Sequence, residues 1–187
     1  MGKPRNRARV RRNRFASWFG VVFVFIFSGC AQPNIAPETP DVLPTATAGD
    51  RISLGLRTAD GVWTEVGAFT DQPTLIFAFA TFDAVSQAAA QPLVFVTQRH
   101  PELNVIAIAA QPYSSGIVEA WKAALQPPFI VAYDPTHSVE EGRSALGRIE
   151  SVPMYFLLNN QARLLAVRVG FQSEEELETL LSEFRIH

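Results

Sequence analysis

The chain has 187 residues, enough for one folded domain with additional segments, and 48% of them are hydrophobic. Its formal net charge of −2 averages two unlike regions. The first 14 residues hold seven of the 16 basic residues and no acidic one, whereas from Cys30 onward nine basic residues face all 18 acidic ones, a net charge of −9. Such an acidic body argues against nucleic acid as a partner, because phosphates bind a basic surface.

The basic segment is followed by 13 uncharged residues, Phe15 to Phe27, and then by Ser28-Gly29-Cys30. This order is typical of a secretory signal, and the apolar part is shorter than the roughly 20 residues of a spanning helix. Residues 27–30 resemble the bacterial lipobox, whose cysteine is lipidated and becomes the first residue of the mature protein. We therefore predict a lipoprotein signal peptide over residues 1–29 and lipidation of Cys30. An uncleaved signal anchor is the alternative.

Cys30 is the only cysteine in the chain. If it carries lipid, the exported part has no thiol, which excludes disulfides, thiol redox catalysis and cysteine-ligated metal there. Residues 30–49 would then be the lipidated cysteine and a tether, because four prolines within residues 33–44 keep the chain semi-extended. We expect the membrane to be a partner through this lipid, with the body on the extracytoplasmic side, in the periplasm or at the cell exterior.

A folded domain is predicted over residues 50–187, and it opens with a hairpin. Alternating apolar residues at 52–56 and 62–66 flank a turn at Ala59-Asp60-Gly61. The buried strand Leu75–Ala80 follows, and then a helix over Ala84–Arg99 that Pro92 is expected to kink.

The second half alternates strands and helices in the same way. Strands are predicted at 105–109 and 129–132, separated by a helix with Ser115 as N-cap and one apolar face carrying Ile117, Trp121, Ala124 and Leu125. A further helix is predicted at 139–146.

The chain is expected to close with a second hairpin and a last helix. The hairpin pairs 154–158 with 164–169, and Ser173 with Glu176 forms a capping box for a helix packed through Leu177, Leu180, Leu181 and Phe184. This order of elements predicts an α/β sandwich in which helices flank a central mixed sheet.

The order of parts resembles the thioredoxin fold, and within it the TlpA/ResA-like branch of membrane-anchored thiol-disulfide oxidoreductases, related to the AhpC/TSA peroxiredoxins. Residues 77–86 correspond to that family's Phe-Trp-Ala-Thr-Trp-Cys-x-x-Cys stretch, and residues 152–164, followed by Gly170, to its Val-Pro-Thr-x-Phe-Leu-Ile-Asp segment. The resemblance covers about residues 50–185. It implies a thioredoxin-like sandwich with an N-terminal β-hairpin.

The two positions that would carry the family's chemistry hold other residues. Asp83 and Ser86 stand where the resemblance places the two cysteines, and a shift of one residue would put Ala84 and Gln87 there instead. Thiol exchange needs a thiolate and a resolving thiol, and neither pair supplies them. We predict no catalytic residue, with Asp83 as a helix N-cap and Ser86 as a packed or solvated hydroxyl.

A peptide-binding groove is the functional hypothesis that remains for this region. In the resembling fold the proline matching Pro153 is cis and abuts the redox turn, and the preceding residue pairs with an extended peptide. We therefore expect a groove between Phe82-Asp83 and Ser151-Val152 that binds a peptide without chemistry. The alternative is that the corner only maintains the fold.

No cofactor or metal is expected. His100, His137 and His187 are scattered on apparent loops or at the terminus, so a three-ligand metal site is not predicted. Glu174-Glu175-Glu176 is interpreted as the first turn of a helix, and Trp63, Trp121 and the phenylalanines as core residues. The favoured function is a lipid-anchored, redox-inactive module that binds a protein partner; the alternative is an enzyme of this family acting through another group or through a partner's cysteines.

Overall fold

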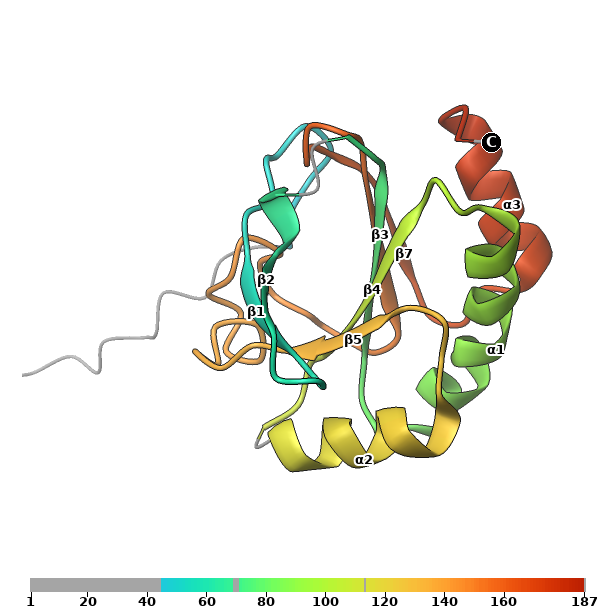
Figure 1. Cartoon of the computed structure of the whole chain (residues 1–187). Helices are drawn as coiled ribbons and strands as arrows, with labels where there is room; N and C mark the ends of the chain where they lie inside the picture. Colours follow the sequence, from blue (N-terminus) through green and yellow to red (C-terminus); the bar gives the residue numbers. More distant parts are fainter. Residues whose placement is uncertain (1–44, 69–70, 113, 187) are drawn as a thin grey trace, which may run out of the picture. The chain divides into compact units, whose positions relative to one another are not determined.

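The structure is a computed structural model, and it describes residues 45–68, 71–112 and 114–186. The predicted signal peptide, Cys30 and most of the tether lie outside the described residues. Within them the chain forms one seven-stranded sheet of order β2-β1-β5-β4-β3-β6-β7, with three α-helices (Figure 1). The predicted α/β architecture with a mixed sheet is confirmed.

The elements have the following bounds. The strands are β1 (Gly55–Thr58), β2 (Trp63–Glu65), β3 (Thr74–Phe79), β4 (Asn104–Ala109), β5 (Ile130–Tyr133), β6 (Met154–Leu158) and β7 (Leu164–Val169). The helices are α1 (Ala84–Arg99), α2 (Ser115–Leu125) and α3 (Glu174–Glu183), with a short 3-10 helix, η1 (Val66–Ala68).

Strand β3 is an interior strand of the sheet, between β4 and β6. It runs parallel to β4 and antiparallel to β6, and β4 in turn runs parallel to β5, so α1 and α2 are the crossovers that parallel neighbours need. All six residues of β3 are buried, which explains why its sequence is a continuous apolar run instead of an alternating one.

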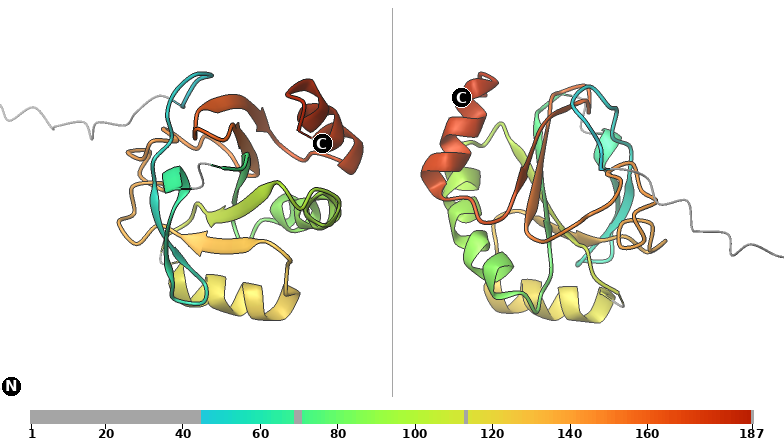
Figure 2. Two further views of the ribbon diagram at one scale, coloured as in Figure 1. Left: turned by 45° about the horizontal axis from the view of Figure 1, so that its top comes forward. Right: turned by 180° about the vertical axis from the view of Figure 1, so that it is seen from behind.

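The two faces of the sheet are covered differently. Leu75, Phe77 and Phe79 of β3 pack in a core that includes buried residues of all three α-helices. Ile76 and Ala78 point to the opposite core, which the N-terminal segment and the loop over residues 134–153 cover without an α-helix. Figures 1 and 2 show the three helices on one side of the sheet and these irregular segments on the other.

The prediction of a helix over residues 139–146 is wrong, because this segment folds as successive turns. The buried carboxylate of Asp134 accepts hydrogen bonds from the backbone N–H groups of Thr136 (2.8 Å) and Val139 (2.9 Å) and from two hydroxyls. Gly142 then takes a φ of +68°, a conformation that favours glycine and ends any helix begun there. The side chain of Asp134 therefore organises a loop where apolar spacing suggested a helix.

Several predicted burial patterns are also wrong. Helix α2 is preceded by Ser114 as its N-cap position, and it buries Val118 and Trp121, whereas Ile117 and Leu125 are each 50% exposed. Trp63 lies on the edge strand β2 and is exposed, as is Phe184 just after α3. A short element at the margin of the sheet covers only a narrow strip of core, so its remaining apolar residues face solvent.

The packed chain begins earlier than Asp50. Ala46 N–H donates to the Leu146 carbonyl (3.0 Å) and Gly49 N–H to the Leu164 carbonyl (2.8 Å). The last residues assigned to the tether, 45–49, are therefore held on the face opposite the helices.

Candidate functional site

The candidate site is the turn between β3 and α1, where the resemblance would place a pair of cysteines. Asp83 is the N-cap of α1, and its carboxylate accepts a hydrogen bond from the backbone N–H of Ser86 at 2.6 Å. This hydrogen bond, with the hydroxyl of Ser86, holds the pKa of the Asp83 carboxyl below its usual value. The predicted N-cap role of Asp83 is confirmed.

Ser86 is fully buried, and its hydroxyl oxygen accepts a hydrogen bond from the Ala80 N–H at 3.3 Å. Among the described residues no histidine lies near it in the hydrogen-bond network that would act as a base. The two residues thus tie the turn to the first turn of the helix. The interpretation of Ser86 as a packed hydroxyl is confirmed.

A buried polar network behind the turn was not predicted. The side-chain oxygen of Gln111 accepts from the Thr81 N–H (2.6 Å) and from the Thr81 hydroxyl (3.0 Å). The Gln87 amide donates to the Thr81 carbonyl (2.6 Å) and accepts from the Trp121 indole N–H (2.9 Å). Two glutamines within otherwise apolar segments were the only sequence signal for this network, which fixes the turn from three elements.

The second half of the predicted groove lies beside this turn. The Val152-Pro153 peptide bond is cis, as the matching bond is in the resembling fold, a point that the sequence left open. Because Ala78 of β3 pairs with Met154 of β6, the corner that precedes Met154 lies at the same end of the sheet as the turn that follows β3. We call Phe82, Asp83, Ser151, Val152 and Pro153 the lip.

The lip presents apolar surface to solvent. Phe82 is 79% exposed, the largest exposure among the large hydrophobic residues described, while Pro153 is buried and Val152 half-buried. Three further exposed apolar residues lie at this end of the sheet. Val85 is in the first turn of α1, and Val169 pairs with Met154, next to the lip. The third is Phe171, next to Gly170, whose N–H donates to the Pro153 carbonyl (2.8 Å). None of these three residues was predicted from the sequence to lie at the site.

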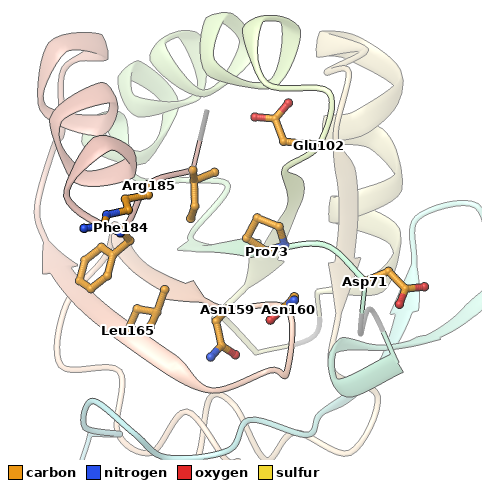
Figure 3. A pocket seen from close by; sticks show the side chains of 9 residues that line it. Asp71, Pro73, Glu102, Asn159, Asn160, Leu165, Phe184 and Arg185 are labelled. Carbon is orange, nitrogen blue, oxygen red and sulfur yellow. The ribbon is translucent and has the colours of Figure 1, made fainter.

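The opposite end of the sheet carries a cavity of about 420 Å³ (Figure 3). It is lined by Pro73, just before β3, by Asn159, just after β6, and by Glu102 and Arg185 among others. Since β3 starts at this end and reaches the lip at its other end, the cavity is separate from the candidate site.

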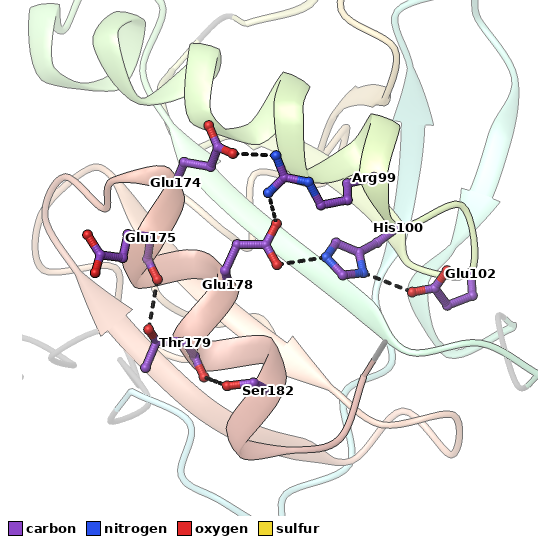
Figure 4. A network of polar contacts seen from close by, with 8 residues as sticks. All are labelled: Arg99, His100, Glu102, Glu174, Glu175, Glu178, Thr179 and Ser182. Carbon is purple, nitrogen blue, oxygen red and sulfur yellow. Dashed lines mark hydrogen bonds and ion pairs between the residues drawn. The ribbon is translucent and has the colours of Figure 1, made fainter.

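His100 is buried at the end of α1 and is not on an open loop as expected. Its Nε2 lies 2.9 Å from Glu178 of α3 and its Nδ1 lies 3.0 Å from Glu102, while Arg99 bonds Glu174 and Glu178 at 2.6 Å each (Figure 4). Burial opposes the charged imidazole, but the two carboxylates outweigh it and raise the pKa of His100. The network joins α1 to α3, which is a structural role.

The described residues contain no cluster of three or more histidine, aspartate and glutamate side chains placed to share a metal ion. His137 Nδ1 lies 2.9 Å from a carboxylate oxygen of Glu140 and belongs to a different segment from His100. His187 lies outside the described residues. Nor does any helix in the described ranges have both the length and the apolar character needed to cross a membrane.

Solved structures with a similar fold are known, although their sequences differ widely from this one. No protein-family model and no curated protein matches the sequence. Among solved structures, the thioredoxin domain of a thiol-disulfide oxidoreductase from Bacteroides vulgatus is similar with a TM-score of 0.64 and 9% identity, over 78% of this chain and 99% of that one. A thio-disulfide isomerase from Thermus thermophilus gives 0.62 and 18%, over 76% and 99%.

A third similar structure is the pneumococcal exposed lipoprotein thioredoxin from Streptococcus pneumoniae, with a TM-score of 0.58 and 14% identity, over 70% of this chain and 98% of that one. At such identities the likeness is one of fold. The domain has the thioredoxin-like fold that the sequence analysis predicted.

Proposed function

We propose that this protein is a lipid-anchored, extracytoplasmic thioredoxin-like module that performs no thiol chemistry and binds a protein partner or an extended peptide at the lip. The observation that carries the proposal is the chemistry of the α1 N-terminus. Asp83 and Ser86 occupy it with hydrogen bonds to the backbone, and the described domain contains no cysteine. A carboxylate and a buried hydroxyl cannot form a mixed disulfide.

The exposure of Phe82 and the hydrogen bonds behind its turn support binding at the lip. Gln111 and Gln87 fix the turn, so Phe82 is held out in solvent on a rigid support instead of a loose loop. An exposed aromatic side chain on a preorganised backbone is a common anchor of protein interfaces. The half-buried Val152 beside it gives an extended peptide a backbone with which to pair.

The proposed location is supported by the sequence around Cys30 and by the description of one protein with a similar fold. The basic and apolar segments before Cys30 are those of a lipoprotein signal, and one similar structure is itself described as an exposed lipoprotein thioredoxin. Lipidation of Cys30 would place the domain beside the membrane surface.

The redox part of the proposal is tested with the purified full-length chain in detergent. We expect insulin disulfides and hydroperoxides to react no faster with the protein than without it. Turnover that persists without added thiol and is lost in Asp83→Ala would contradict the proposal. It would favour the second candidate, an enzyme acting through the Asp83 carboxylate.

The binding part is tested by photo-crosslinking in intact cells. A photoreactive phenylalanine analogue replaces Phe82, and in a matched control it replaces Phe95, which is also exposed but lies late in α1. We expect a defined adduct from position 82, and its loss when Val152→Asp is added. Adducts of the same size and amount from both positions would show that the lip is not the binding surface.

A further inference from the structure

Two arginines face each other across an isolated antiparallel bridge, Arg51 opposite Arg163. The N–H groups of the residues that follow them, Ile52 and Leu164, make the flanking hydrogen bonds at 2.8 Å each. Arg51 and Arg163 are therefore a non-hydrogen-bonded pair, the position at which opposed side chains come closest. Like charges at this spacing destabilise a fold unless an anion lies between them.

The protein itself supplies no such anion among the described residues. Neither guanidinium has a carboxylate within the 4.0 Å of an ion pair there, and the carboxylate of the neighbouring Asp50 accepts from the N–H (2.8 Å) and hydroxyl (3.1 Å) of Thr47. Nη1 of Arg163 donates to the Gly49 carbonyl at 3.0 Å, which positions its guanidinium and leaves its other donors available.

A cavity of about 270 Å³ lies over the pair, lined by Arg51, Asn160, Gln161 and Arg163. Two arginines, an asparagine and a glutamine line it, and no acidic residue does. Guanidinium groups bind phosphate with two parallel hydrogen bonds, and carboxamide N–H groups can complete the set. The lining thus suits a phosphate group.

The position of this cavity indicates where the phosphate comes from. Arg51 is six residues after Thr45, the first described residue, and the 15 residues from Cys30 to Thr45 span at most about 50 Å when fully extended. A lipid on Cys30 would therefore keep the cavity within reach of the bilayer at a high effective concentration of headgroups.

We propose that the Arg51–Arg163 cavity binds the headgroup phosphate of an anionic membrane lipid. The inference rests on the proposed lipid anchor. It also orients the domain: β7 begins beside Arg163 and ends at Val169 near the lip, so a domain docked through the arginines turns the lip away from the bilayer and towards soluble partners. The acidic remainder of the domain would be repelled by the same surface, which favours this one orientation.

The experiment is an NMR titration of the full-length protein in neutral detergent micelles, with the arginine Nε–H signals as readout. The probes are a short-chain phosphatidylglycerol, the matching phosphatidylcholine and inorganic phosphate. We expect saturable shifts of the Arg51 and Arg163 signals with phosphatidylglycerol. Arg51→Gln and Arg163→Gln should each weaken binding about fivefold.

Arg57→Gln is the charge-matched control, since Arg57 lies on β1 and does not line the cavity. Binding should be unchanged in this variant. An equal loss in Arg57→Gln, or no shift with phosphatidylglycerol, would overturn the proposal, and equal binding of inorganic phosphate would overturn the assignment to lipid. Crosslinking from position 82 does not depend on this result, so failure here is distinguishable from failure of the proposed function.

Discussion

Two parallel strands of the sheet are each followed by an aspartate that binds backbone N–H groups, and the chain continues differently after each. After β3, Asp83 caps a helix by accepting a hydrogen bond from the Ser86 N–H. After β5, Asp134 gathers four donors from Thr136, Ser138 and Val139, and the chain forms a loop.

The spacing of the donors makes the difference. A carboxylate that bonds only the N–H three residues on satisfies the helix N-terminus and leaves the next turns free to form. The carboxylate of Asp134 instead accepts from the N–H groups two and five residues on, and helix geometry would direct the latter to a backbone carbonyl. Asp134 is 6% exposed. The partly exposed Asp83 thus supports one element, whereas the buried Asp134 holds together the face of the sheet that lacks helices.

Replacing Asp134 should have the largest effect of the changes that test this comparison. Asp134→Ala leaves four donors of the loop without their acceptor, and we expect the free energy of unfolding to fall by about 3 kcal/mol. Asp134→Asn keeps the shape and one acceptor oxygen, so about half of that loss is expected. Urea denaturation measures both. A loss no larger than that of an exposed substitution would show that the loop does not depend on Asp134.

Low pH should remove the contribution of the Asp134 carboxylate to the free energy of unfolding. Burial raises the pKa of Asp134, but its hydrogen bonds outweigh burial and lower the pKa below the usual value. Its contribution is therefore complete above the unfolded pKa of about 3.9 and is lost as the pH falls through the lower folded pKa. The stability difference between the wild type and Asp134→Asn should be constant from about pH 5 to 7 and narrow below about pH 4.

Replacing Gln111 tests whether the turn before α1 is as rigid as the Asp134 loop. Gln111→Leu leaves the Thr81 N–H and hydroxyl without an acceptor, and we expect a loss of about 2 kcal/mol. Thr81→Val removes only the hydroxyl and should cost about half as much. Hydrogen exchange at residues 80–83 should rise in Gln111→Leu; unchanged protection there would refute a supporting role.

Replacing Asp83 should have the smallest effect. Asp83→Ala removes the cap of α1, which a partly exposed carboxylate supplies, so we expect the melting temperature to fall by roughly 2–4 °C. Asp83→Ser retains a capping oxygen and should restore most of the difference. Calorimetry distinguishes these outcomes, and a fall as large as that of Asp134→Ala would remove the contrast between the two aspartates.

The strands, α1, the capped helix α3 and the roles of Asp83 and Ser86 followed from the sequence alone, because each depends on neighbours within a few residues. An apolar run, an N-cap three residues before its donor and a capping box are local signals. The sequence alone likewise shows that no cysteine follows Cys30.

The remaining features depended on residues that are distant in the chain. Gln111 is 30 residues from Thr81, and Arg163 is far from Arg51, so no periodicity pairs them. Residues 139–146 form a loop and not the predicted helix, because the buried carboxylate of Asp134 binds donors on this segment. The sequence does not show that this carboxylate is buried. Local hydrogen bonds and apolar spacing specify elements, whereas the pairing of strands decides which polar groups meet and which apolar side chains, Phe82 among them, stay in solvent.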